Sequence, residues 1–73
     1  MRDLEIEIQL NGEKKKVPEG ISIAALIVNL DLDVTRVAVE HNLQILKREK
    51  WQVTKLADRD RIEIVQFVGG GLS

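Results

Sequence analysis

Residues 61–73 of this chain read RIEIVQFVGGGLS, a strand-like run that passes directly into three glycines. β-Branched and aromatic residues dominate Arg61–Val68, and neither Pro nor Gly interrupts it, which predicts a β-strand. The glycines that follow, Gly69, Gly70 and Gly71, carry no Cβ and keep the backbone flexible. Three extended residues reach about 10 Å and can enter a slot too narrow for any side chain. We interpret the rest of the chain as a rigid support for this tail, although glycine-rich ends are also common as unstructured extensions.

The composition predicts one small domain with an aliphatic core. The chain has 73 residues, of which 44% are hydrophobic and only 3% are aromatic. Cysteine is absent, which excludes disulfides, thiolate metal sites and thiol redox centres. No apolar run is long enough for a membrane span and the N-terminus is too charged for a signal peptide, so we expect a cytoplasmic protein. A net charge of −1 argues against nucleic acid as the main partner.

The first half of the sequence predicts a β-hairpin followed by a helix. Leu4–Leu10 alternates apolar and polar residues, Asn11-Gly12 is a strong hairpin-turn signal, and Pro18 ends the return strand. The lysine run Lys14–Lys16 is interpreted as protection of an edge strand rather than as an anion site. Ser22 is expected to cap a helix. The apolar residues of that helix repeat at i, i+3, i+4 and i+7: Ile23, Leu26, Ile27 and Leu30.

The second half predicts shorter elements before the final strand. Arg36–Glu40 alternates and predicts a third strand, His41-Asn42 a turn, and Leu43–Leu46 a short fourth strand. Lys47–Trp51 predicts a single helical turn. The tryptophan that ends it is expected to plug the core, rather than to serve as a platform for a stacked ligand.

This order of elements predicts an α+β fold. One main helix is expected to cover one face of a mixed sheet of four or five strands, the β-grasp or ubiquitin-like roll. The two most apolar strands, Leu4–Leu10 and Ile62–Val68, are expected at the centre of the sheet. Residues 1–68 then form one domain, and residues 69–73 form a flexible glycine-rich tail.

The final strand also predicts a docking patch. If Ile62 and Ile64 face the core, Val65 and Phe67 lie on the face of the sheet that carries no helix. An exposed apolar pair beside a flexible tail is typical of a surface that binds a partner. The alternative is that the segment around Trp51 partly covers the pair.

The sequence predicts no catalytic or metal site of its own. His41 is the only histidine and is interpreted as a surface residue, while Asp58 and Asp60 occupy a turn that favours Asp for backbone reasons. The remaining reactive group is a carboxylate on the glycine tail. A carboxylate becomes electrophilic once an ATP-using partner converts it to an acyl adenylate, and a sulfur nucleophile that displaces AMP then leaves a thiocarboxylate.

Several stretches of the chain resemble the sulfur carriers of thiamine biosynthesis, the ThiS family. The similar segments cover essentially the whole chain: Leu10–Glu13, Val37–Asn42, Arg48–Trp51, Asp60–Val65 and Phe67–Gly71. The Arg-Glu-x-Trp stretch together with a strand that ends in glycines is the more specific part of this resemblance.

The resemblance implies a β-grasp carrier that is not itself an enzyme and that binds no cofactor. A ThiF-type adenylyltransferase would use ATP to activate the terminal glycine, and a sulfur donor system would convert it to a thiocarboxylate. A ThiG-type thiazole synthase would receive the sulfur; no nucleic acid or membrane takes part. Gly71 would carry the sulfur, Gly69–Gly70 would form the flexible tail, and Val65, Phe67 and Val68 would contact the partners.

The chain departs from this family in one respect, because Leu72-Ser73 follow the glycines and hold the Gly71 carboxyl group in a peptide bond. We expect that a protease removes these two residues, unless they are not part of the natural protein. Other interpretations stay open: a MoaD-like small subunit of molybdopterin synthase, a ubiquitin-like modifier, or a β-grasp module that binds a ligand or RNA and for which the glycines are incidental.

Overall fold

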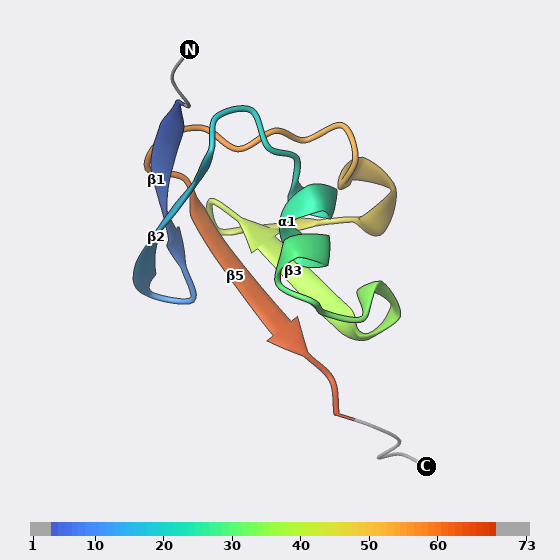
Figure 1. Cartoon of the computed structure of the whole chain (residues 1–73). Helices are drawn as coiled ribbons and strands as arrows, with labels where there is room; N and C mark the ends of the chain where they lie inside the picture. The colour runs from blue at the N-terminus through green and yellow to red at the C-terminus, as the bar shows by residue number, and fades with distance from the viewer. Residues whose placement is uncertain (1–3, 69–73) are drawn as a thin grey trace.

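The computed structural model describes residues 4–68 and shows a five-stranded mixed sheet with one α-helix packed on one face (Figure 1). The strands run in the spatial order β2-β1-β5-β3-β4. Their bounds are Glu5–Leu10 (β1), Glu13–Pro18 (β2), Val37–His41 (β3), Gln44–Leu46 (β4) and Arg61–Gln66 (β5). Strand β5 lies at the centre, parallel to β1 and antiparallel to β3. The predicted β-grasp roll and the central position of its last strand are confirmed.

The β1–β2 hairpin forms as its turn residues predict. Asn11 and Gly12 have φ angles of 51° and 85°, the positive values that a type I′ turn requires. Asn tolerates this conformation through its short polar side chain, and Gly does so because it has no Cβ. Strand β2 is an edge strand, so its lysine run Lys14–Lys16 lies where the edge-protection interpretation placed it.

Helix α1 (Ile23–Asn29) begins and ends close to the predicted positions. The Ser22 hydroxyl accepts a hydrogen bond from the Ala25 N–H at 3.0 Å, which satisfies one of the free donors of the first turn. Leu30 caps the other end and is half-buried. Two short 3₁₀ turns complete the helical structure: η1 (Val34–Arg36) and η2 (Arg48–Lys50).

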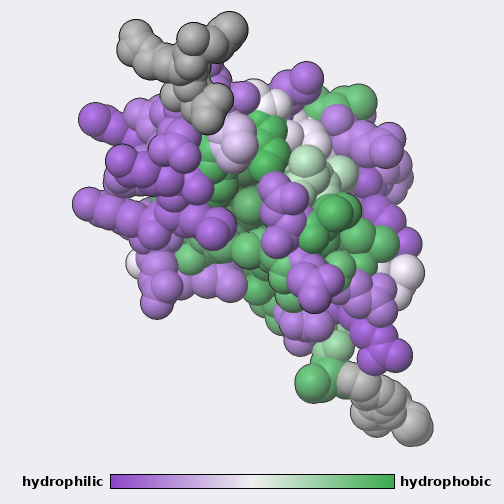
Figure 2. Space-filling view, viewed as in Figure 1, coloured by the Kyte–Doolittle hydropathy of each residue, from purple (hydrophilic) through white to green (hydrophobic). Residues whose placement is uncertain are grey.

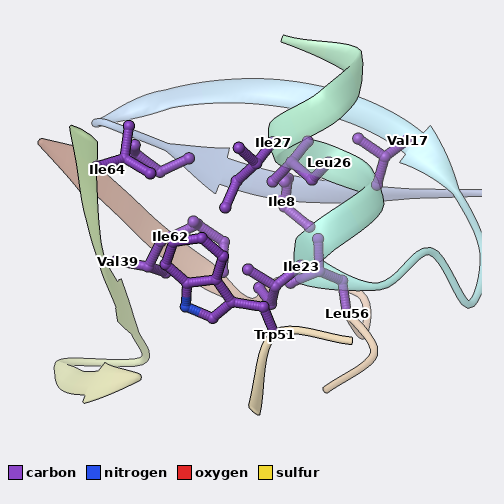
Figure 3. Close-up of a cluster of buried hydrophobic side chains, with 11 residues drawn as sticks. Ile8, Val17, Ile23, Leu26, Ile27, Val39, Trp51, Leu56, Ile62 and Ile64 are labelled. Atoms are coloured by element: carbon purple, nitrogen blue, oxygen red, sulfur yellow. The ribbon is translucent and has the colours of Figure 1, made fainter. Parts of the chain in front are cut away.

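The core lies between α1 and the sheet and is almost entirely aliphatic (Figure 3). Trp51 closes one end of it and is 4% exposed, as predicted for a structural plug. Its indole Nε1–H donates to the Leu46 carbonyl at 3.0 Å, so the one polar atom of this side chain is satisfied. The buried side chains are Ile8, Val17, Ile23, Leu26, Ile27, Val37, Val39, Trp51, Leu56, Ile62 and Ile64.

Three local predictions need correction. Leu4 precedes β1 and is 61% exposed, so the apolar face of that strand starts later than the alternation suggests. His41 belongs to β3, because its backbone still pairs with Ile62 and Gln44, and the turn falls on Asn42-Leu43 instead. Strand β5 ends at Gln66, two residues before the predicted end.

Replacement of Leu26 by Ala is expected to lower the free energy of unfolding by about 2–5 kcal/mol, because this side chain is 1% exposed and its loss opens a cavity. Chemical denaturation measured by circular dichroism would give the change. Val28→Ala is the matched control on the same helix, since Val28 is 67% exposed, and its effect should stay within about 0.5 kcal/mol. Similar losses for both variants would contradict the assigned face of α1.

Candidate docking surface at the end of the last strand

The C-terminal end of β5 carries exposed apolar side chains, as the alternation predicts. Ile62 and Ile64 face the core and are 0% and 8% exposed, whereas Val65 and Phe67 are each 56% exposed. Val68 follows the strand and is 84% exposed. Figure 2 shows apolar surface directly before the C-terminal grey atoms. The predicted exposure of Val65 and Phe67 is therefore confirmed, while the partner-binding role of these two residues and of Val68 stays a prediction.

A shallow apolar hollow adjoins Val65 on the helix-free face. It has a volume of about 180 Å³, and its apolar walls include Ala38 from β3 and Ile45 from β4. Ala38 lies directly opposite Val65 across the β3–β5 ladder. Ile45 is 79% exposed, an unusual exposure for a β-branched residue in the middle of a strand. We define the docking surface as Ala38, Ile45, Val65, Phe67 and Val68.

Sequence reasoning missed Ala38 and Ile45 as members of this surface. The alternation of β3 held the signal for Ala38, because Val37 and Val39 are buried and the residue between them must face away from the core. Ile45 needed the register of the β3–β4 hairpin, which pairs it with Glu40 and so fixes its face. No sequence feature specifies that register without knowledge of the turn.

The segment around Trp51 does not cover the docking surface, which excludes the alternative raised by the sequence. Trp51 packs with Ile62 and Val39 on the helix side of the sheet, so the segment around it does not reach the open face (Figure 3). The alternation of the strands places Val65 on the opposite side from these core residues. The docking surface is thus open within the described part of the chain.

Charged side chains confine the apolar area to one end of the open face. Glu40 and Glu63 are direct cross-strand neighbours and border the hollow. Glu7, Lys14 and Arg59 line a second hollow of about 340 Å³ beside β1. A partner that covers the apolar end therefore meets an acidic border, which favours basic groups on the partner's side.

Asn11 connects the β1–β2 hairpin to the middle of β5. Its side-chain Oδ1 accepts from the Ile64 N–H at 2.8 Å, and its Nδ2 donates to the Ile64 carbonyl at 3.3 Å. The Asn11 backbone N–H also donates to the Ile62 carbonyl at 2.9 Å. One turn residue thus fixes the strand that leads to the glycines.

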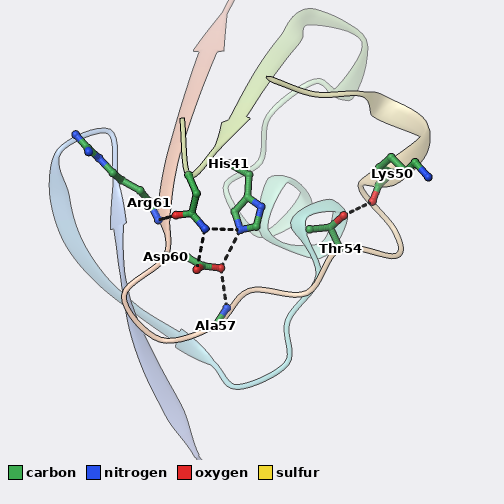
Figure 4. A network of polar contacts seen from close by, with 7 residues as sticks. His41, Lys50, Thr54, Ala57, Asp60 and Arg61 are labelled. Atoms are coloured by element: carbon green, nitrogen blue, oxygen red, sulfur yellow. Dashed lines mark hydrogen bonds and ion pairs between the residues drawn. The ribbon is translucent and has the colours of Figure 1, made fainter. Parts of the chain in front are cut away.

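A polar cluster at the other end of β5 fixes its entry into the sheet (Figure 4). His41 Nε2 lies 2.8 Å from Asp60 Oδ2, and their side chains are 21% and 14% exposed. Asp60 also accepts from the Ala57 N–H at 2.9 Å and from the Asn42 amide at 3.1 Å. Asn42 in turn accepts from the Arg61 N–H at 2.8 Å. The prediction of His41 as a free surface residue is therefore wrong, because its spatial partner lies 19 residues away.

The Asp60 cluster favours the ionised carboxylate. Burial alone raises the pKa of Asp60, but hydrogen bonds from His41, Ala57 and Asn42 outweigh it, so the pKa lies below its ordinary value. A depressed pKa means that the folded state binds this proton less tightly than the unfolded state does. The resulting stability is present above the unfolded-state pKa and is lost as the pH falls through the folded-state pKa.

Replacement of Asp60 by Asn is expected to lower the free energy of unfolding by about 1–3 kcal/mol at pH 7, because buried donors lose a carboxylate acceptor. The difference from wild type should narrow as the pH falls below about 4, where the unfolded chain binds the Asp60 proton, and should vanish once the pH passes below the lowered folded-state pKa. Urea denaturation at a series of pH values would measure this difference in the free energy of unfolding. Glu19→Gln is the control, since Glu19 is exposed and only its backbone N–H takes part in the hydrogen bonds given for it. A difference that stays constant down to pH 2 would contradict the role of the charge.

Two features are absent from the described part of the chain. Within residues 4–68, no three His, Asp or Glu side chains lie together so that they could hold a metal ion. No helix of that range is long and apolar enough to cross a membrane. The predicted tail residues Gly69, Gly70 and Gly71, with Leu72-Ser73 after them, lie outside the described residues. The division into a domain of residues 1–68 and a tail of residues 69–73 stays a prediction.

Comparisons with known proteins extend through these glycines. The sequence profile of the ThiS family matches residues 5–71. The sulfur carrier protein ThiS of Bacillus subtilis is 42% identical over 65 residues, which cover 88% of this chain and 98% of that protein. A crystal structure of the thiamine biosynthesis protein ThiS from Geobacter metallireducens superimposes with a TM-score of 0.78 at 30% identity, over 90% of this chain and 100% of that one.

The chain is also similar to part of a larger protein. A thiazole synthase of Paramagnetospirillum magneticum is 35% identical over 66 residues, which cover 90% of this chain but 20% of that protein. A thiazole synthase of Magnetococcus marinus matches with the same coverage. The chain thus spans about a fifth of the length of these relatives.

Proposed function

The chain belongs to the ThiS family, and we propose that it carries sulfur for thiamine biosynthesis as a thiocarboxylate on Gly71. The observations that support this proposal are the structural match to a ThiS protein and the sequence match to the ThiS family, which runs from residue 5 through the glycines to residue 71. The rigid sheet and the exposed apolar end of β5 agree with a carrier that presents a tail to other proteins. The chain then acts as a co-substrate of its partners rather than as an enzyme.

Loading of the tail needs two steps and a free carboxylate. In the first step, a Gly71 carboxylate oxygen attacks the α-phosphorus of ATP, pyrophosphate leaves, and an acyl adenylate forms on a ThiF-type enzyme. In the second step, hydrosulfide released by the sulfur donor system attacks the acyl carbon, AMP leaves with the electron pair of the C–O bond, and loss of the S–H proton gives the thiocarboxylate. The product is a thiocarboxylate, which is a better nucleophile than the carboxylate it replaces.

Delivery of the sulfur then needs an acceptor enzyme. We propose that a ThiG-type thiazole synthase is this acceptor, supported by the thiazole synthases of which one fifth resembles this chain. The docking surface of Ala38, Ile45, Val65, Phe67 and Val68 would hold the enzyme while the tail enters its active site. ATP belongs to the loading step and not to this chain, and the whole sequence of steps would take place in the cytoplasm.

The acceptor is tested with a sulfur-loaded chain that ends at Gly71. This chain is incubated either with thiazole synthase and its substrates or with the large subunit of molybdopterin synthase. We expect thiazole formation in the first reaction, with return of the carrier to its unloaded mass, and no sulfur loss in the second. Sulfur transfer only to the molybdopterin enzyme would overturn the proposal in favour of a MoaD-like carrier.

A further inference from the structure

Strand β5 leaves its two neighbours at different points. The parallel register with β1 ends at the pair Leu10–Ile62, because the chain turns away into the hairpin. On the opposite side, β3 remains paired as far as Gln66. Strand β5 therefore projects past β1 with one edge paired and the other edge open. Among residues 4–68, no strand lies beside Gln66 on the β1 side.

The backbone groups on the open edge follow from the ladder geometry. In a strand, successive residues direct their N–H and C=O groups to opposite edges. The Phe67 N–H donates to the Arg36 carbonyl at 2.7 Å, so this residue faces the β3 edge. The Ile64 N–H points the other way, to the side chain of Asn11. Gln66, two residues after Ile64, thus presents both its N–H and its C=O on the open edge.

Asn11 sets the point at which this open edge begins. Its side-chain amide accepts from the Ile64 N–H and donates to the Ile64 carbonyl, as a peptide group of a neighbouring strand would do. Pairing on the β1 side is thereby extended to Ile64 and then stops. The next pair of backbone groups, on Gln66, is the first one available to another chain.

The open edge of β5 at Gln66 lacks the protection against pairing with other chains that β2 has. Strand β2 is a true edge strand and carries the run Lys14–Lys16, which opposes pairing with other chains. No charged residue, proline or glycine occurs between Ile64 and Val68, where the sequence reads IVQFV. An open edge of such composition favours the addition of a further strand.

We propose that an extended segment of thiazole synthase pairs with the open edge of β5 at Gln66–Val68. The proposal rests on the sulfur-carrier function proposed above and specifies how the acceptor holds the tail. In strand addition, backbone hydrogen bonds supply affinity and alternate side chains supply specificity. Phe67 and Val68 provide such side chains, with 56% and 84% of their surfaces exposed.

Two observations identify thiazole synthase as the occupant. In the relatives from Paramagnetospirillum and Magnetococcus, a stretch similar to this chain forms part of the thiazole synthase itself, which favours thiazole synthase as the partner. The distance from Gln66 to Gly71 also suits sulfur delivery, because about five extended residues span about 17 Å and can reach from the pairing site into an active site. A strand pairing at Gln66 would thus direct the tail and set how deeply Gly71 enters the active site.

Amide hydrogen exchange tests the pairing directly. The ¹⁵N-labelled 73-residue chain is studied by NMR alone and with thiazole synthase from the same organism. We expect the Gln66 amide to exchange rapidly in the free chain and about tenfold or more slowly in the complex. The Phe67 amide is the internal control, because its hydrogen bond to Arg36 protects it in both states.

A pair of variants tests the same backbone group by affinity. Gln66→Pro removes the N–H on the open edge, where proline is tolerated, and leaves the hydrogen bond of Phe67 to β3 in place. Gln66→Ala shortens the side chain but keeps the N–H. We expect Gln66→Pro to weaken binding to thiazole synthase about tenfold and Gln66→Ala to stay within about twofold. Thermal unfolding of both variants verifies that the sheet is intact.

Each remaining outcome overturns the pairing. A complex in which the Gln66 amide still exchanges rapidly means that only side chains dock. Absence of any complex removes thiazole synthase as the occupant. Protection of Gln66 in the free chain that increases with protein concentration assigns the edge to a second copy. Sulfur loading by the adenylating enzyme is measured separately, so failure of the carrier function is distinguished from failure of the pairing.

Discussion

A chain that ends at Gly71 is expected to gain about 16 Da with ATP, an adenylating enzyme and a sulfur source, whereas the 73-residue chain is expected to keep its mass. The gain corresponds to one oxygen replaced by sulfur. In the longer chain, the carbonyl carbon of Gly71 is bonded to the nitrogen of Leu72, so no carboxylate oxygen is available to attack ATP. Intact-mass spectrometry of both chains, with the same enzyme preparation, measures the difference.

A third chain, which ends at Gly70, shows whether loading depends only on a free carboxylate or also on the length of the tail. It presents a free carboxylate but is shorter by one residue, about 3.3 Å when extended. We expect it to be loaded much more slowly than the chain that ends at Gly71. Equal loading of the 73-residue chain, with Leu72-Ser73 still attached, would remove Gly71 from its proposed role.

Val65→Asp is expected to weaken binding to thiazole synthase about 100-fold. Val65 lies directly opposite Ala38 and lines the apolar hollow together with Ala38 and Ile45. An unpaired carboxylate buried there costs about 2–5 kcal/mol, and about 2.7 kcal/mol corresponds to a 100-fold change in Kd. Isothermal titration calorimetry would measure the change.

The matched control for this variant is Gln9→Asp, which adds the same charge to the same face. Gln9 is exposed on β1, in the polar part of the sheet face that also includes Lys14. We expect the affinity of Gln9→Asp for thiazole synthase to stay within about twofold of wild type, and both variants to unfold at the wild-type temperature. Equal weakening by both would indicate a long-range charge effect and would argue against a localised docking surface.

The parts of the fold that the sequence predicts are those set by local patterns. Three such features are confirmed, and each depends on residues that are close together in the sequence: the alternation of β1, the Asn11-Gly12 turn and the Ser22 cap. The central position of β5 can also be predicted from the sequence, because the core-facing residues of this strand are apolar and no Pro or Gly interrupts it. Leu4 was misjudged because alternation alone does not show where the helix stops covering the strand.

The parts that sequence reasoning missed depend on contacts between distant residues. The partner of His41 is Asp60, and the partner of the Asn11 side chain is Ile64, 53 residues away. Such pairs need the register of the sheet, which no short pattern contains. Ile45 joined the docking surface for the same reason, since only its pairing with Glu40 places it on the open face.

The parallel pairing of β1 with β5 also has a kinetic consequence. It joins Gln9 to Arg61, so the centre of the sheet unites segments from opposite ends of the sequence. Native contacts of such long sequence separation require closure of a large loop before they contribute stability, and they slow folding to about milliseconds or longer. We therefore expect the hairpin and α1, whose contacts are local, to form before β5 closes the core. The strand that closes the core is therefore also the strand that leads to the glycines in the sequence.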